Sequence, residues 1–148
     1  MRLVSLTYAA GLSSTGHPNI DTALPLPEAF EIPAATVATI REAKERGGRV
    51  IAVGSTVVRA LEGAAARSGV LEPGSGITDL RIGARHELRV VDGIFTAIHV
   101  GGESHFELLR AFVPADLLGE ALSYAETHDF TTHELGDAML DLPSRRLA

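Results

Sequence analysis

A glycine, two hydroxyl side chains and an arginine lie close together in the middle of the chain, namely Gly54, Ser55, Thr56 and Arg59. The apolar run 49–53 before them is typical of a buried parallel strand, and 56–67 has the pattern of a helix. Free backbone N–H groups at the start of such a helix favour an anion or a ribose hydroxyl. Arg59 follows Ser55 by four residues, so both side chains lie on one helix face. This spacing predicts a binding site for a carboxylate, a phosphate or a ribose.

The alternative is that this segment is structural. Ser55 or Thr56 then only caps the helix, and Arg59 pairs with Glu62 on the surface. The segment matches neither a P-loop nor a G-x-G-x-x-G fingerprint.

Histidine supplies a second candidate for chemistry. His99 lies near the end of an expected strand, 94–100, just before Gly101–Gly102. A histidine there suits proton transfer, whereas the alternative is a structural histidine bonded to the backbone. Ser55, His99 and Asp79 would be the members of a hydrolase triad, but the chain has no G-x-S-x-G elbow. The six histidines form no HxxxH or HExxH pair and cysteine is absent, so we expect no metal site.

Two turn-rich segments can either wrap a ligand or serve only as turns. The first contains Ser75, Thr78 and Asp79, and the second is Gly136–Asp137. Spacing alone favours plain turns in both segments.

These candidates need strands and helices to position them. The pattern predicts strands over 2–8, 49–53, 77–82, 87–91 and 94–100, an extended piece at 30–32, and helices over 34–46, 56–67, 104–112 and 115–128. Ser104 would cap the third helix, and Asp92–Gly93 predicts a β-hairpin. The segment 134–142 is ambiguous, with 137–140 a possible closing strand. We therefore expect one α/β domain, 1–148, on an open, mostly parallel sheet with 49–53 as a central strand.

The composition excludes several classes of protein. Of 148 residues 45% are hydrophobic, and no apolar run reaches the roughly 18–20 residues needed to cross a bilayer. The absence of cysteine makes the cytoplasm the default location. With 13 basic against 19 acidic residues the net charge is −6, which does not support a self-sufficient nucleic-acid binder.

Several of these segments, in this order, resemble S-adenosylmethionine:tRNA ribosyltransferase-isomerase, the enzyme family of queuosine biosynthesis. The most specific stretch runs from the Glu-Ile-Pro at 31–33 through Ala-Lys-Glu-Arg-Gly-Gly-Arg-Val-Ile-Ala-Val-Gly-Ser-Thr-Val-Val-Arg, which ends at Arg59. Further matching anchors are Pro-Gly-Ser-Gly at 73–76, Thr78-Asp79, Val-Val-Asp at 90–92, Thr96 with His99, Ser104, and Gly-Asp-Ala-Met at 136–139. The resemblance covers the chain from about residue 3 to residue 142.

The resemblance implies a fold, a reaction and a set of site residues. The fold would be a Rossmann-like, three-layer α/β domain beside a separate β-barrel. The enzyme would transfer the ribosyl part of S-adenosylmethionine, its co-substrate, to a 7-aminomethyl-7-deazaguanine in tRNA and rearrange it. The resemblance supports the positions of His99 and Thr96, and we assign them catalytic roles, with His99 as a proton-transfer group near the ribose. The substrate-binding residues would be Gly54, Ser55, Thr56, Arg59, Ser75, Thr78, Asp79, Ser104 and Asp137.

The chain also departs from this family. Family members are more than twice as long, and the half that supplies the barrel has no counterpart here. We therefore expect either a fragment or a truncated paralogue. The alternative function is a non-catalytic module that binds a nucleoside or another protein. Surface normally covered by the missing half would then be buried by a partner or by self-association.

Overall fold

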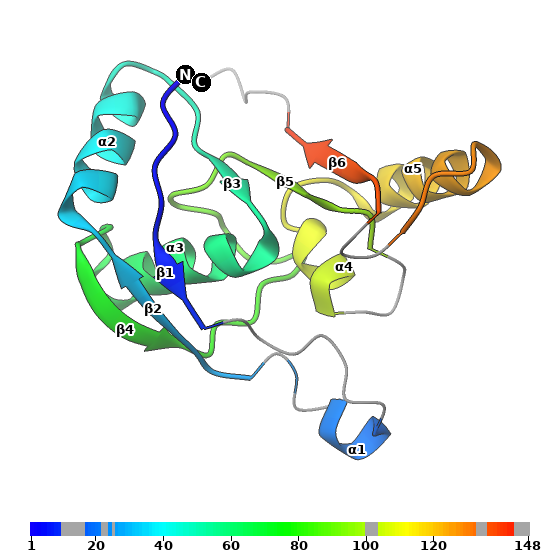
Figure 1. Ribbon diagram of the computed structural model, residues 1–148, viewed down its shortest axis with the longest axis horizontal. Coiled ribbons are helices and arrows are strands. Elements are labelled where there is room, and N and C mark those ends of the chain that lie inside the picture. Colours follow the sequence, from blue (N-terminus) through cyan, green and yellow to red (C-terminus); the bar gives the residue numbers. More distant parts are fainter. Residues whose placement is uncertain (10–16, 22–23, 25, 100–103, 133–135, 144–148) are drawn as a thin grey trace.

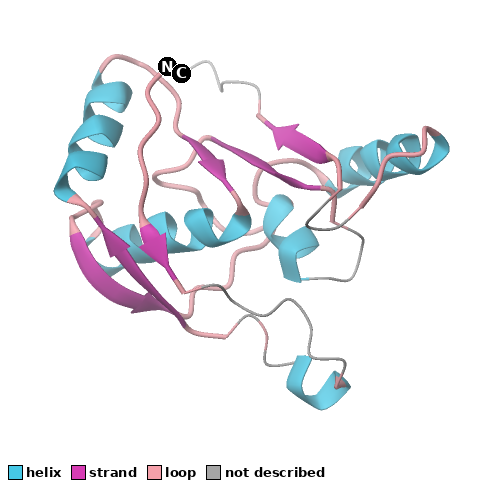
Figure 2. Ribbon diagram, in the orientation of Figure 1, coloured by secondary structure: helices cyan, strands magenta, loops and turns pink. Residues whose placement is uncertain are grey.

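The computed structural model describes residues 1–9, 17–21, 24, 26–99, 104–132 and 136–143 of the chain. Along the chain the elements are β1 (Thr7–Tyr8), α1 (Pro18–Asp21), β2 (Glu28–Ile32), α2 (Ala34–Glu45), β3 (Ile51–Val53), α3 (Ser55–Ser68), β4 (Gly74–Thr78), β5 (Gly93–Ala97), α4 (Ser104–Leu109), α5 (Ala115–Thr127) and β6 (Ala138–Asp141). Figures 1 and 2 show their arrangement. The α/β class expected from the sequence is confirmed.

The strands of the described residues form two sheets of three strands each. One sheet has the order β1-β2-β4 and is antiparallel throughout. In the other, of order β3-β5-β6, β3 is parallel to β5 and β5 is antiparallel to β6. The expectation of one mostly parallel sheet is therefore wrong for this part of the chain. Within the predicted strand 49–53 only Ile51–Val53 form a parallel strand, and this strand lies at an edge of its sheet, because β5 takes the central place.

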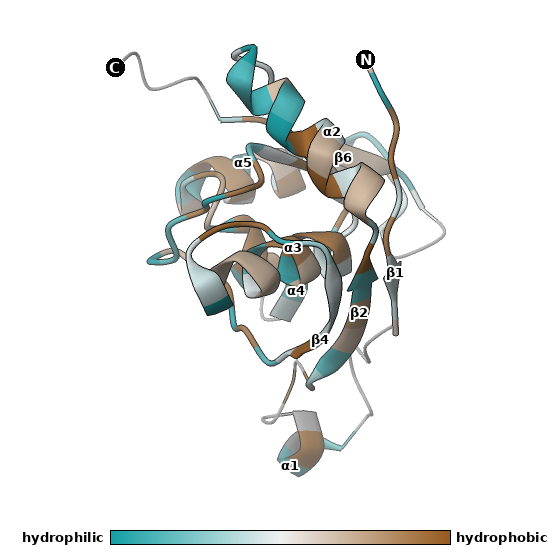
Figure 3. Ribbon diagram, turned by 90° about the vertical axis from the view of Figure 1, so that its left-hand side faces the viewer, coloured by the Kyte–Doolittle hydropathy of each residue, from teal (hydrophilic) through white to brown (hydrophobic). Residues whose placement is uncertain are grey.

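The helices α2 and α3 follow the predicted ranges 34–46 and 56–67 closely. Pro33 takes the N-cap position of α2, where its fixed φ suits entry into a helix. Gly47 has φ 68° just after α2, and Gly69 is the left-handed C-cap of α3. Figure 3 shows the hydrophilic residues of α2 gathered toward one end of the helix. These local signals explain why both helices could be predicted.

Helix α3 organises the core because it packs against strands of both sheets. Its inner face carries Val58, Leu61 and Ala65, which are all buried. Gly63 on the same helix allows a close approach, since a Cβ there would lie 2.2 Å from the Thr78 hydroxyl oxygen. The two sheets are therefore joined mainly through one helix.

The predicted hairpin around Asp92–Gly93 is wrong, because 87–91 does not form a strand. Instead the carboxylate of Glu62 on α3 accepts hydrogen bonds from the backbone N–H groups of Arg89, Val90 and Val91, at 3.0, 2.9 and 2.9 Å. One fully buried side chain thus satisfies donors that a neighbouring strand would otherwise satisfy.

The predicted strand 2–8 is also shorter than expected. Only Thr7 and Tyr8 pair with β2. The preceding residues run alongside α2, where the Thr36 hydroxyl donates to the Ser5 carbonyl at 2.6 Å and Arg2 pairs with Glu42. The predicted helix 104–112 is α-helical only as far as Leu109.

One face of the β3-β5-β6 sheet carries a row of exposed apolar side chains. Val53 is paired with Phe95, and Phe95 with Leu140, so the three lie side by side across the sheet. They are 59%, 44% and 54% exposed, respectively. A three-layer domain would cover this face, and the described residues do not.

None of the helices in the part of the chain that the structure describes is long and apolar enough to cross a membrane.

Candidate functional site

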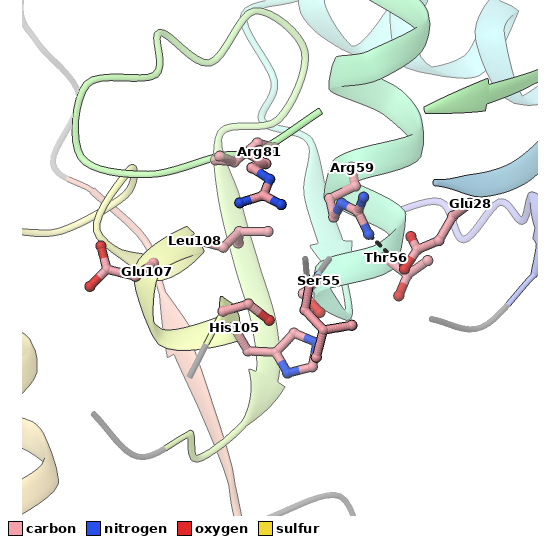
Figure 4. A pocket seen from close by; sticks show the side chains of 11 residues that line it. Glu28, Ser55, Thr56, Arg59, Arg81, His105, Glu107 and Leu108 are labelled. Carbon is pink, nitrogen blue, oxygen red and sulfur yellow. Dashed lines mark ion pairs between the residues drawn. The ribbon is translucent and has the colours of Figure 1, made fainter. Parts of the chain in front are cut away.

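A cavity of about 180 Å³ lies at the N-terminal end of α3. It is lined by Leu24, Glu28, Ser55, Thr56, Arg59, Arg81, Ile82, Ser104, His105, Glu107 and Leu108. Figure 4 shows Ser55, Thr56 and Arg59 on α3 and His105 and Leu108 on α4 around the same space. Ligands of α/β sheets commonly bind beyond the carboxyl ends of strands, which is where this cavity lies relative to β3.

The turn from β3 into α3 is made possible by Gly54. Its φ of 92° is unfavourable for residues with a side chain, and its N–H donates to the Phe95 carbonyl at 2.9 Å. Gly54 occupies the N-cap position, so the alternative in which Ser55 or Thr56 only caps the helix is wrong. Both residues line the cavity together with Arg59.

The guanidinium of Arg59 is buried and holds three acceptors of the protein. Its Nη1 pairs with Glu28 Oε1 at 2.6 Å, its Nε donates to the Leu80 carbonyl at 3.1 Å, and its Nη2 donates to the Leu26 carbonyl at 3.0 Å. The pairing of Arg59 with Glu62 on the surface, which the structural alternative required, is therefore wrong. Burial lowers the pKa of Arg59, and the charge of Glu28 partly opposes this.

Glu28 is a member of the site that sequence reasoning missed. It lies on the inward-facing side of β2 together with Phe30 and Ile32, and only 6% of its surface is exposed. Burial raises its pKa, while Arg59 acts in the opposite direction. A signal was present, since an acid that alternates with two apolar residues in a strand falls on the buried face.

His99 and Thr96, the predicted catalytic pair, lie together at the end of β5. The Thr96 hydroxyl and His99 Nε2 are 3.1 Å apart, and both residues are buried. Because β3 and β5 are parallel, their carboxyl ends meet at the same edge of the sheet. The His99 ring also contacts the ring of His105, with centroids 4.7 Å apart, and His105 lines the cavity. The predicted Gly101–Gly102 turn lies outside the described residues.

The other predicted binding residues are divided between the cavity and elsewhere. Ser104, the first residue of α4, lines the cavity, whereas Ser75 lines a second hollow of about 350 Å³ beside Arg67. Thr78 is buried and its hydroxyl accepts the Leu80 N–H at 3.2 Å, which is the role of a turn residue.

Asp79 and Asp137 do not line the cavity either. Asp79 is exposed, although it is close enough to Arg59 for its charge to act on that guanidinium. Asp137 Oδ2 accepts the Thr131 N–H at 2.8 Å, so its carboxylate ties the backbone of Thr131 to the start of β6. Within the described ranges, no group of three or more His, Asp or Glu side chains could hold a metal ion.

Comparisons with known proteins all match this chain to one family, over most of its length. The family model described as queuosine biosynthesis protein matches residues 2–140. S-adenosylmethionine:tRNA ribosyltransferase-isomerase of Synechococcus elongatus is 43% identical over 120 residues, which cover 81% of this chain and 33% of that protein. The enzyme of the same name from Natranaerobius thermophilus is 38% identical over 140 residues, which cover 93% of this chain and 41% of that protein.

A solved structure gives the same result. The S-adenosylmethionine tRNA ribosyltransferase of Thermotoga maritima matches with a TM-score of 0.71 and 38% identity, over 76% of this chain and 40% of that one. The chain thus spans about a third of the length of the curated relatives it matches first. Family model, sequence identity and fold agree, and the chain belongs to the S-adenosylmethionine:tRNA ribosyltransferase-isomerase family of queuosine biosynthesis.

Proposed function

We propose that this chain forms the S-adenosylmethionine-binding part of a ribosyltransferase-isomerase acting on tRNA. The reaction would transfer the ribosyl group of S-adenosylmethionine to a 7-deazaguanine base, isomerise it, and release adenine and methionine. One observation carries the proposal: hydroxyl groups, a helix N-terminus and a histidine line one cavity at the end of a parallel strand. Relatives with 38–45% identity bear the name of this activity.

The start of α3 supports binding of the co-substrate. Ser55 and Thr56 line the cavity with their hydroxyl groups, and the N–H groups of a first helical turn, which have no partner within the helix, favour a ribose oxygen or a carboxylate. Ser104 brings a third hydroxyl from α4. The sequence analysis expected Arg59 to bind the ligand, but its guanidinium instead binds Glu28 and two backbone carbonyls beside the cavity.

His99 is proposed as the proton-transfer residue. The rearrangement requires removal of a proton from carbon and protonation of departing adenine, both of which are suited to a histidine. The contact of its Nε2 with the Thr96 hydroxyl fixes the orientation of the ring. His99 does not line the cavity itself, and its ring contact with His105 would connect it to bound ligand.

The larger assembly is part of the proposal. We infer a Rossmann-like core whose barrel domain belongs to the portion of the relatives without counterpart in these 148 residues. Because the net charge is −6, tRNA would be held largely by that portion. The cytoplasm, where tRNA is modified, is the proposed location, and no metal is required.

The test combines binding and turnover. Calorimetry of this chain with S-adenosylmethionine should show saturable binding. An active form that includes the remaining family portion should release adenine in the presence of tRNA bearing 7-aminomethyl-7-deazaguanine. His99→Ala should slow that release roughly 10²–10⁴-fold and change binding far less. Unchanged turnover with a lowered melting temperature would remove His99 from catalysis.

A second candidate function, a non-catalytic interaction module, is favoured by the apolar row of Val53, Phe95 and Leu140. Its occupant would be the family portion that this chain does not match. Phe95→Ser should then weaken binding of that portion without affecting S-adenosylmethionine. Sedimentation distinguishes this from self-association, in which Phe95→Ser would lower the mass of the chain alone. A chain that binds this portion but no S-adenosylmethionine would support the module and refute the enzyme.

A further inference from the structure

Two charged side chains absent from the sequence-based candidates, Glu28 and Arg81, line the cavity at the start of α3. Glu28 comes from β2, and Arg81 from the segment that follows β4 (Figure 4). The cavity volume of about 180 Å³ is below the roughly 300–1,000 Å³ of pockets that enclose a whole small-molecule ligand. It therefore suits one end of a molecule as large as S-adenosylmethionine.

Glu28 carries an acceptor atom that has no donor. Its Oε1 is paired with Arg59, but its Oε2 has less than 1 Å² of exposed surface and no hydrogen-bond partner among the described residues. An unsatisfied buried carboxylate oxygen is costly, and an N–H group from a ligand would relieve that cost. The terminal torsion of a glutamate is soft, so Oε2 can turn toward the cavity that Glu28 already lines.

Arg81 is the more exposed of the two arginines that line the cavity, so its guanidinium is the more accessible to an anionic group. Each nitrogen of Arg59 is already engaged with a protein acceptor. Arg81 is exposed, lines the cavity, and lies near enough to Arg59 for charge repulsion to act between them. Glu107 also lines the cavity, but its carboxylate accepts hydrogen bonds from Arg110 at 2.8 and 3.1 Å. An incoming carboxylate would therefore be stabilised chiefly by Arg81.

We propose that Glu28 and Arg81 bind the zwitterionic amino-acid end of S-adenosylmethionine. The ammonium donates to Glu28 Oε2, and the carboxylate accepts from Arg81. The ribose then lies toward Ser55 and Thr56 at the start of α3. This proposal rests on the proposed function, and it moves recognition of the methionine carboxylate from Arg59 to Arg81.

The first test varies the ligand and leaves the protein intact. Calorimetry compares S-adenosylmethionine with its decarboxylated analogue, which keeps the ammonium and the nucleoside. Loss of the contact with Arg81 should weaken binding roughly 10- to 100-fold. Equal affinities would overturn the proposal while leaving the proposed function intact. Absence of S-adenosylmethionine binding would refute both, so the two failures can be told apart.

The second test varies the protein. Arg81→Gln should weaken S-adenosylmethionine binding to the level of the decarboxylated analogue. The variant should bind the two ligands with equal affinity, because the guanidinium and the ligand carboxylate contribute only as a pair. Glu28→Gln should also weaken binding of both ligands, because each retains the ammonium. The matched controls are Arg85→Gln and Glu31→Gln, both at exposed positions, and neither should change either affinity.

Adenosine serves as a further probe, because it lacks the amino-acid end. Its affinity should be the same for the unaltered chain, Arg81→Gln and Glu28→Gln. If adenosine binding falls together with that of S-adenosylmethionine, the two residues do not recognise the amino-acid end and the proposal fails. If Glu28→Gln does not fold, Arg81→Gln and the ligand comparison still decide the outcome.

Discussion

Replacement of Arg59 by alanine should destabilise the fold strongly. The side chains of Arg59 and Glu28 are only 5% and 7% exposed, so the substitution leaves a buried carboxylate without its counter-charge. It also removes the hydrogen bonds that Arg59 donates to the carbonyls of Leu26 and Leu80. Removal of one member of a buried pair costs about 3–5 kcal/mol. For a chain of 148 residues this corresponds to a decrease in melting temperature of roughly 6–20 °C.

A thermal melt followed by circular dichroism measures the effect, with Arg46→Ala as the control. Arg46 pairs with Glu42 at 3.4 Å, but both side chains are about half exposed, so solvent screening leaves this pair less than about 0.5 kcal/mol. The double variant Glu28→Leu with Arg59→Met should recover part of the loss, because no unpaired charge remains. A melting temperature for Arg59→Ala within about 2 °C of the parent would refute the reasoning.

Two further predictions concern stability. Burial raises the pKa of Asp141 to about 6, from an ordinary value of 3.8. The folded state therefore binds the proton more tightly than the unfolded state, and stability should fall by about 2–3 kcal/mol as the pH rises from 4 to 7. Asp141→Asn should flatten this dependence in denaturant titrations at several pH values, and an unchanged slope would show that another group is responsible. Gly63→Ala should lower the free energy of unfolding by about 1–3 kcal/mol, because the added Cβ would overlap the Thr78 side chain. Gly119→Ala in α5 should raise it by about 0.5–1 kcal/mol, because the added Cβ meets no atom within 4 Å and alanine favours the helix. Chemical denaturation of both glycine variants checks the opposite signs.

The local parts of the fold could be predicted from sequence because their signals are local. Helices α2 and α3 are bounded by Pro33, Gly47 and Gly69, and their apolar residues recur at helical spacing. The grouping of Ser55 with Arg59 around one cavity followed from the same geometry, since an interval of four residues places side chains on one helix face.

The long-range parts could not be predicted in this way. The register between β2 and β4 brings Glu28 toward α3, and no local pattern encodes that register. The failed hairpin has the same origin, because Glu62 satisfies the backbone of 89–91 from a distance of 27 to 29 residues along the chain. The mostly parallel sheet was inferred from strand–helix alternation, which does not determine the direction of β6.

Arg59 and Glu62 lie three residues apart on α3, and each is a buried charged side chain that forms hydrogen bonds with the backbone of irregular segments. Arg59 holds the carbonyls of Leu26 and Leu80, and Glu62 holds the N–H groups of 89–91. No helix or strand includes Leu26, Leu80 or residues 89–91. The side chains of Arg59 and Glu62 therefore supply backbone hydrogen bonds that a helix or a sheet would otherwise provide.

The residues around the cavity are of two kinds: those that hold the fold together and those that are available to a ligand. A substitution at Arg59 displaces the segments before β2 and after β4, so it should change stability and affinity together. Substitutions at the half-buried Thr56 and the exposed Arg81 should change affinity with less loss of stability than substitutions at the buried Arg59. Loss of S-adenosylmethionine binding in an Arg59 variant is therefore not evidence that the guanidinium touches the ligand. Only variants whose melting temperature is unchanged can assign a contact with the ligand at this site.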